Sequence, residues 1–216
     1  FLSLTQHSPQ IGLPKEFRQI YRNVEKGDAT KRYLNAQHVA DKFLREFLVQ
    51  FRSRTRYRDA VLIITGDHSY PFGEHVSSNE RGAYEENFRV PFLIIWKDEI
   101  HPQRYKQIPF SQVDIAPTVL DIADISEPHH FIGRSIFSPT EVRAVCMNQP
   151  YDELFHVAVI YPFKYVKSVY GNRELLFNLG VDPGETLNLA RNADYAEQIL
   201  SGREAIQQLL VNQILI

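Results

Sequence analysis

The chain has 216 residues, of which 44% are hydrophobic and 23% charged, which is typical of a globular protein and excludes a disordered one. Its formal net charge of -2 excludes a general attraction to nucleic acid, so no nucleic-acid partner is expected. A single cysteine, Cys146, excludes an internal disulfide and a cysteine-rich zinc cluster. No run of about 18 apolar residues occurs, so we expect a soluble piece with no transmembrane helix.

The first residues are typical of a strand that begins without a cap or a turn. Residues 1–5 read Phe-Leu-Ser-Leu-Thr, and no initiating methionine precedes them. We therefore expect the chain to be a fragment of a longer protein. Residues 15–22 then predict a short helix, which ends before Gly27.

Apolar side chains next recur at helical spacing between Thr30 and Phe51. The positions concerned are Tyr33, Ala36, Ala40, Phe43, Leu44, Phe47, Leu48 and Phe51. This pattern predicts an amphipathic helix that covers a sheet, with its aromatic side chains in the core. Residues 52–58 are basic; they indicate a helix C-terminus and a solvated loop, with phosphate or RNA binding as the weaker alternative.

A short β-branched run at residues 60–64 predicts a strand that is buried on both faces of a parallel sheet. Asp67 and His68 follow it directly, and Glu74 and His75 come a few residues later. Ligands bind beyond the carboxyl ends of strands in open α/β sheets, and carboxylate and imidazole are ordinary metal ligands. Asp67 and His68 are therefore candidates for a divalent metal site. The alternatives are that the pair caps a helix or binds backbone amides, and that Glu74 and His75 form a solvated turn.

Further along, residues 76–82 are polar and aperiodic and predict a loop over the site. Residues 90–96 predict a second apolar strand. Ser111 and Asp114 offer oxygen caps to a helix at residues 115–123.

After about residue 141 the pattern changes to short β segments, at residues 142–147, 155–160, 164–170 and 174–178. Gly171-Asn172 is a type I′ hairpin signal, and residues 195–215 predict a closing helix. The predicted fold class is α/β, with a mostly parallel sheet flanked by helices and a small C-terminal antiparallel sheet. We place the boundary between these two parts at residues 140 and 141.

Several blocks in order resemble the C-terminal half of the sulfatase branch of the alkaline phosphatase superfamily, which includes the lipoteichoic acid synthase-like phosphoglycerol transferases. The blocks are Thr-Gly-Asp-His-Ser at 65–69, Gly-Glu-His at 73–75, Tyr-Glu-Glu-Asn-Phe-Arg-Val-Pro at 84–91, and the segments 111–123, 133–136 and 176–190. The resemblance implies a partial alkaline phosphatase-like fold. Residues 1–140 would be the C-terminal half of its catalytic domain, and residues 141–216 a smaller subdomain.

The same resemblance implies roles for particular residues. Asp67 and His68 would bind a divalent metal ion (Mn, Zn or Ca), while His7, His75 and Arg81 would bind the phosphate or sulfate end of an ester substrate. In the family the nucleophile and the remaining metal ligands lie upstream of Phe1, so the resemblance implies that the partner of this chain is the missing N-terminal half of the same protein. This fragment alone is therefore expected to be inactive.

The sequence departs from the sulfatase pattern at one position. Sulfatases have a lysine four residues before the tyrosine of the Tyr-Glu block, and this chain has Glu80 there, followed by Arg81. Together with the His-x-Pro motif at residues 7–9, this departure favours metal-dependent phosphoryl transfer on phosphoglycerol or phosphoethanolamine lipid head groups. The resemblance to the lipoteichoic acid synthase-like enzymes implies an enzyme anchored in a bacterial cell membrane with an extracytoplasmic catalytic domain. The alternatives are a sulfuric ester hydrolase, and a non-catalytic module that binds an anionic glycan or lipid head group.

Overall fold

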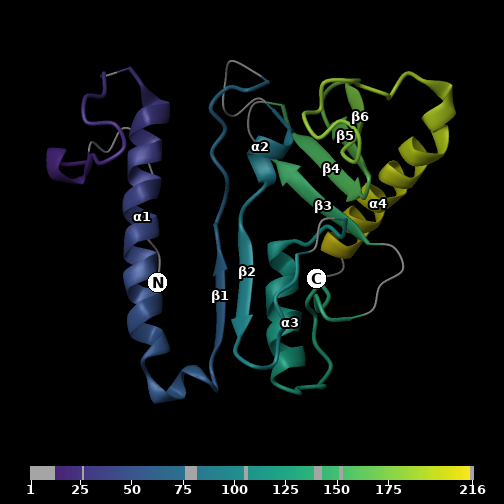
Figure 1. Cartoon of the computed structure of the whole chain (residues 1–216). Coiled ribbons are helices and arrows are strands. Elements are labelled where there is room, and N and C mark those ends of the chain that lie inside the picture. The colour runs from purple at the N-terminus through teal and green to yellow at the C-terminus, as the bar shows by residue number, and fades with distance from the viewer. Residues whose placement is uncertain are drawn as a thin grey trace. The chain divides into compact units, whose positions relative to one another are not determined.

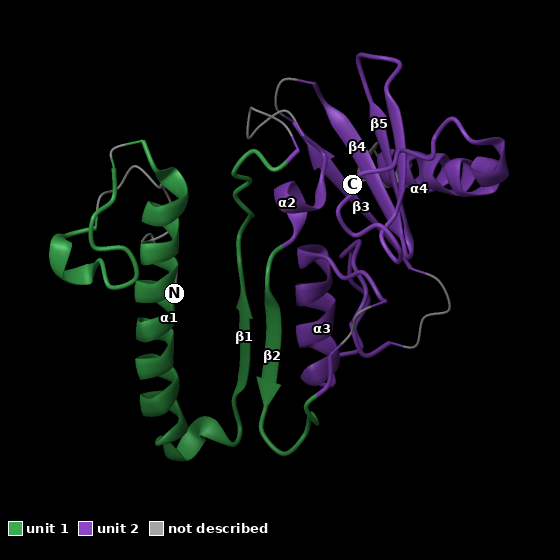
Figure 2. Cartoon of the chain, turned by 45° about the horizontal axis from the view of Figure 1, so that its top comes forward, with its two compact units in different colours: residues 1–74, 90–102 green, residues 75–89, 103–216 purple. Residues whose placement is uncertain are grey.

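The structure is a computed structural model that describes residues 13–25, 27–75, 82–104, 107–138, 143–150 and 153–214 (Figure 1). The chain divides into two compact units, coloured separately in Figure 2. Unit 1 comprises residues 1–74 and 90–102, and unit 2 comprises residues 75–89 and 103–216. The predicted domain boundary at residue 140 stays a prediction. His7, Arg81 and the predicted strand at residues 1–5 lie outside the described residues.

Unit 1 contains the long predicted helix, α1 (Ala29–Arg52). It begins after Asp28, whose carboxylate accepts the Lys31 N–H at 2.9 Å and so satisfies one of the free amides of the first turn. On its buried side Asn35, 1% exposed, accepts the Ile20 and Tyr21 N–H groups at 3.1 and 3.0 Å. The amide of Asn35 therefore binds the preceding segment to the helix. Within that segment, the helix predicted at residues 15–22 is reduced to a single 3-10 turn, Lys15–Phe17.

The aromatic stripe of α1 is not core within this chain, so that prediction is wrong. Phe43 and Phe47 are 50% and 49% exposed, and Leu44 is 36% exposed. Helical periodicity shows that one face of a helix requires an apolar cover, but it does not show which segment supplies the cover. In this chain, the described residues leave much of that face open.

The two strands of unit 1 are antiparallel, which corrects the predicted parallel sheet. Both predicted strands are present, as β1 (Val61–Thr65) and β2 (Phe92–Trp96). They pair with Val61 opposite Trp96 and Thr65 opposite Phe92. The parallel sheet was predicted from the apolar run. Such a run indicates that both faces of a strand are buried, but it does not determine the direction of the neighbouring strand.

Unit 2 is built on an antiparallel sheet in the order β3-β4-β5-β6, which confirms the small C-terminal sheet. The strands are β3 (Ala144–Gln149), β4 (Phe155–Ile160), β5 (Phe163–Ser168) and β6 (Glu174–Asn178). The closing helix, α4 (Ala196–Ile214), is also confirmed, and it packs through Ile206 on one face of the sheet. The other face packs against Ala83 and the short helix α2 (Glu85–Phe88). Both faces of this sheet are therefore covered.

Helix α4 packs closely against the sheet where Gly202 of α4 meets Tyr165 of β5. A Cβ at Gly202 would lie 2.5 Å from the Cβ of Tyr165, so only glycine fits there. Beside it, the Tyr165 hydroxyl donates to Glu174, which also accepts from Arg203 Nη2 at 2.8 Å. The hydrogen bond from Arg203 lowers the pKa of Glu174 to about 2, and burial raises the pKa of Tyr165 to about 12.

Helix α3 (Ile115–Ile122) follows the predicted caps. Asp114, 2% exposed, accepts the Ser111 N–H at 2.7 Å and the Arg134 N–H at 2.9 Å, and it pairs with the side chain of Arg143. Asp114 is therefore a structural carboxylate that joins α3 to the segment after it. None of the helices in the described ranges is long and apolar enough to cross a membrane.

Candidate functional site

The polar segment that follows β1 begins with a tight packing contact in unit 1. A Cβ at Gly66 would lie 3.3 Å from two side-chain carbons of Val90, closer than most real contacts. A larger residue there would push apart the end of β1 and the start of the chain that leads into β2. Gly66 therefore allows the end of β1 to pack closely against Val90, directly before Asp67 and His68.

Asp67 and His68 lie side by side, and both are exposed. The His68 N–H donates to Asp67 Oδ1 at 2.9 Å, and His68 Nδ1 lies 2.8 Å from the Ser69 carbonyl oxygen. Because a carbonyl only accepts, Nδ1 carries the proton, and in the neutral form of the ring the lone pair lies on Nε2. Nε2 lies 3.8 Å from Asp67 Oδ2, and the two side chains are 64% and 63% exposed. The ring is thus oriented as in metal sites, where the second nitrogen of a ligand histidine donates to a carbonyl or carboxylate.

This pair fits part of a metal coordination sphere. Bonds from zinc to imidazole nitrogen and carboxylate oxygen are about 2.0–2.2 Å long, so a single ion spans two atoms that are 3.8 Å apart. Among the described residues, no group of three or more His, Cys, Asp or Glu side chains is placed to hold an ion. Residues 66–75 form no helix, which removes the helix-capping alternative, whereas Asp67 does bind a backbone amide.

Two aromatic residues anchor this segment to α1 within unit 1. The Tyr33 ring lies 6.3 Å from Tyr70 and 4.9 Å from Phe72, measured between centroids, and the last two rings are 5.2 Å apart. Glu74 Oε2 also accepts the Phe72 N–H at 2.8 Å. The sequence analysis missed these anchors, although aromatic residues in an otherwise polar loop are a usable signal of packing.

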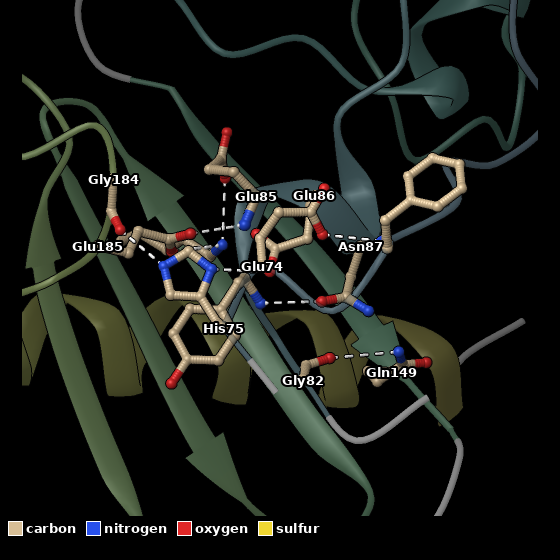
Figure 3. A network of polar contacts seen from close by, with 12 residues as sticks. Glu74, His75, Gly82, Glu85, Glu86, Asn87, Gln149, Gly184 and Glu185 are labelled. Atoms are coloured by element: carbon tan, nitrogen blue, oxygen red, sulfur yellow. Dashed lines mark hydrogen bonds and ion pairs between the residues drawn. The ribbon is translucent and has the colours of Figure 1, made fainter. Parts of the chain in front are cut away.

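His75 lies in unit 2, in the polar network of Figure 3. Its Nδ1 is 2.7 Å from Glu86 Oε1, and its Nε2 is 2.6 Å from the Gly184 carbonyl oxygen. The ring stacks on Tyr84, with centroids 4.1 Å apart and planes inclined by 6°. Burial by itself lowers the pKa of His75, but the hydrogen bonds to Gly184 and Glu86 outweigh it and raise the pKa above its ordinary value.

A buried group of charges lies in the same unit, on the face of the sheet that α2 covers. Lys164 is 0% exposed, and its Nζ lies 2.8 Å from Glu185 Oε1 and 3.1 Å from Glu85 Oε1. The other Glu185 oxygen accepts the Glu85 N–H at 2.6 Å. Burial raises the pKa of Glu185, although the nearby Lys164 opposes the shift. This group was not predicted from the sequence; the available signal was Lys164, next to Phe163 at the start of β5 and on the same face as Val166.

The described candidate residues lie in two units. Asp67 and His68 are adjacent in unit 1, and His75 is bonded to Glu86 and to the Gly184 carbonyl in unit 2.

Comparison with known proteins gives matches along nearly the whole chain. The profile of the sulfatase family matches residues 3–125. The profile described as N-sulphoglucosamine sulphohydrolase, C-terminal, matches residues 73–212.

Individual relatives agree with these profiles. An arylsulfatase of Clostridium perfringens is 24% identical over 193 residues, which cover 84% of this chain and 39% of that protein. A solved structure in complex with its substrate D-glucosamine-2-N,6-O-disulfate has a TM-score of 0.74 and 21% identity, and the match covers 87% of this chain and 41% of that one. The phosphonate monoester hydrolase of Agrobacterium radiobacter has a TM-score of 0.63 and 24% identity, covering 95% and 46%.

The chain thus spans less than half the length of each of these three proteins. The structural likeness shows the alkaline phosphatase-like fold, and the matches favour the sulfatase alternative over the phosphoryl-transfer interpretation. Enzymes of this superfamily use a metal ion, in keeping with the donors at Asp67 and His68. Because a single profile covers more than half of its residues, the chain belongs to the sulfatase family.

Proposed function

We propose that the protein to which this chain belongs is a metal-dependent hydrolase of sulfate esters. The observation that carries the proposal is the Asp67–His68 pair at the end of β1, in a chain of the sulfatase family. The two donor atoms lie 3.8 Å apart, and the Ser69 carbonyl fixes the ring so that Nε2 carries the lone pair. This is the donor set and orientation that a divalent ion requires.

Asp67 and His68 supply two of the ligands in this proposal. They would hold a divalent ion (Mn, Zn or Ca), which would supply Lewis-acid chemistry by polarising the ester and lowering the pKa of an attacking hydroxyl group. The nucleophile and the remaining ligands belong to the missing N-terminal half, so the contribution of this chain is to hold the ion and to position the substrate. The loop that carries the pair stays in place because Tyr70 and Phe72 pack on Tyr33 of α1.

His7 and Arg81 are the proposed contacts to the substrate anion. A guanidinium group binds two oxygens of a sulfate or phosphate group at once, and an imidazole donates a single hydrogen bond. Arg81 would supply the positive charge that the family's lysine supplies, because Glu80 occupies the position of that lysine.

A sulfated amino sugar is the substrate class that we favour. Two findings support it: the match to a profile named for an N-sulphoglucosamine sulphohydrolase, and the likeness to a structure that holds a glucosamine disulfate.

Hydrolysis of a phosphate or phosphonate ester, including a phosphoglycerol-type lipid head group, is the second candidate. Its support is Glu80 at the family's lysine position and the match to a phosphonate monoester hydrolase.

Steady-state kinetics of the full-length protein with added divalent metal would test these functions. The substrates are glucosamine 6-sulfate, p-nitrophenyl sulfate and p-nitrophenyl phenylphosphonate. We expect the highest kcat/KM for a sulfate ester, and a loss of about a hundredfold or more in Asp67→Ala and His68→Ala. His101→Ala is the matched control, since His101 is an exposed histidine of unit 1.

Faster turnover of the phosphonate ester would contradict the sulfatase proposal in favour of the second candidate. A metal-loaded protein that turned over none of the three substrates would indicate the non-catalytic binding module.

A further inference from the structure

His75 is bonded through both ring nitrogens to groups that accept hydrogen bonds. Nε2 lies 2.6 Å from the Gly184 carbonyl oxygen, which carries no proton. Nδ1 lies 2.7 Å from Glu86 Oε1, a carboxylate that accepts in its ionised form. A neutral imidazole has a single N–H and can satisfy only one of these acceptors. With Glu86 ionised, the geometry therefore fits the doubly protonated, positively charged ring.

The bridge joins segments of unit 2 that are far apart in the sequence. Glu86 lies in α2, whereas Gly184 lies in the turn after β6, 109 positions from His75. The ring also stacks flat on Tyr84, the N-cap residue of α2. Figure 3 shows the ring between the Gly184 carbonyl and the Glu86 side chain. His75 thus contacts the N-cap residue of α2, the second residue of that helix, and the turn at Gly184.

The turn itself is well defined. Asp182 accepts from the Thr186 hydroxyl at 3.0 Å and from the Leu187 N–H at 2.9 Å. Glu185 has a φ of 52°, and its side chain is buried against Lys164. The Gly184 carbonyl therefore projects from a turn with an internal set of hydrogen bonds, so it is a fixed acceptor.

The charges around the ring favour a cation at this position. Glu86 faces the ring from α2. On the turn, the negative charge of Glu185 helps to raise the pKa of His75, and the charge of His75 helps to lower the pKa of Asp182. On β5, Lys164 already pairs with Glu85 and Glu185. Without a charge on His75, the four described carboxylates of Glu85, Glu86, Asp182 and Glu185 face Lys164, and the 17%-exposed Glu86 side chain loses its ion pair with His75.

We propose that His75 is a positioning residue, a protonated bridge that holds α2 against the turn at residues 182–185, and not a ligand of the substrate. A substrate anion would have to displace the Gly184 carbonyl or the Glu86 carboxylate to reach either ring nitrogen. The role goes beyond the proposed function, because it does not depend on which ester the enzyme hydrolyses.

The bridge has a defined pH dependence. Because the folded state raises the pKa of His75, the stability that the bridge supplies is complete below the ordinary histidine pKa of about 6.5. That stability is lost as the pH rises through the raised pKa. His156 shows the opposite behaviour, because burial lowers its pKa, and it gives an internal reference in the same protein.

Long-range ¹H–¹⁵N NMR of the histidine rings would test the proposal, with His75 assigned by the loss of its signals in His75→Gln. We expect the titration midpoint of His75 to lie above that of His156, with both ring nitrogens of His75 protonated below its midpoint. Glu86→Gln should lower the midpoint of His75, because it removes the charge while keeping an oxygen acceptor. Glu197→Gln makes the same change on an exposed residue of α4 and should leave the midpoint unchanged.

Thermal unfolding as a function of pH supplies a second readout. The wild-type protein should lose stability as the pH passes the His75 midpoint, and Glu86→Gln should lose it at lower pH. A neutral His75 ring at pH 6.5, or a midpoint that Glu86→Gln leaves unchanged, would overturn the proposal. If His75→Gln fails to fold, sequential backbone and side-chain assignment of the wild-type protein identifies the His75 ring signals instead, and the effect of Glu86→Gln on them decides the question.

Discussion

Replacement of Lys164 by methionine tests the role of the buried charges most sharply. The change removes a cation from a side chain that is 0% exposed and keeps an apolar side chain of similar length. Glu185, whose side chain is 1% exposed, then loses its partner at 2.8 Å. Removal of one member of a buried ion pair costs about 3–5 kcal/mol, because the remaining charge is neither paired nor hydrated. The contact with Glu85 adds less, since that side chain is 25% exposed and water screens it.

The loss should appear as a fall in Tm of roughly 6–20 °C, at about 2–4 °C per kcal/mol for a chain of this size. A second change, Glu185→Gln, should restore much of the stability of Lys164→Met, because the amide oxygen still accepts the Glu85 N–H without a buried charge. The deficit of Lys164→Met should also be smaller at about pH 4 than at neutral pH, since burial raises the pKa of Glu185 and favours its neutral form.

Urea and thermal unfolding, followed by far-ultraviolet circular dichroism, give the free energies of the single and double variants. The reasoning would be refuted if Lys164→Met stayed within about 1 kcal/mol of wild type at neutral pH. A double variant less stable than Lys164→Met would refute it as well.

Three further outcomes follow from the structure. Gly202→Ala should destabilise the protein by about 1–3 kcal/mol in thermal unfolding, because the new Cβ would lie 2.5 Å from that of Tyr165; an unchanged Tm would contradict this packing. Glu174, with its pKa lowered to about 2 by Arg203, should supply stability that is complete above the ordinary glutamate pKa of about 4.5 and is lost as the pH falls toward 2. Arg203→Gln should weaken this acid dependence, and an identical pH profile would rule out the pairing. His7→Ala in the full-length enzyme should lower kcat/KM by about a hundredfold or more with metal content intact, and near wild-type turnover would show that His7 is not a substrate contact.

The local elements could be predicted from the sequence, because each depends on neighbours in the chain. The segments 155–160 and 174–178 match β4 and β6 to the residue. Partly alternating apolar residues and the turn signal at Gly171-Asn172 determine this part of the sheet. The long helix α1 and the capped helix α3 were likewise predicted within two residues at each end.

Contacts between distant segments could not be predicted in this way. The apolar run of β1 indicates burial, but its antiparallel pairing with β2 depends on how the chain returns from residue 65 to residue 92. The bond from His75 to the Gly184 carbonyl crosses 109 positions, and nothing local marks either partner. Only the resemblance to a known family pointed to a functional role for His75, and the ring contacts assign it a structural one in our proposal.

Metal binding by the full-length protein tests the central claim most directly, namely that Asp67 and His68 supply two donors of a divalent metal site. Elemental analysis and calorimetric titration with manganese, zinc and calcium would compare the wild-type protein with Asp67→Ala, His68→Ala and the control His101→Ala. We expect the wild type and the control to bind a divalent ion with the same stoichiometry, and each of the other two variants to lose the ion or to bind it at least tenfold more weakly. Unchanged stoichiometry and affinity in both Asp67→Ala and His68→Ala would contradict the account.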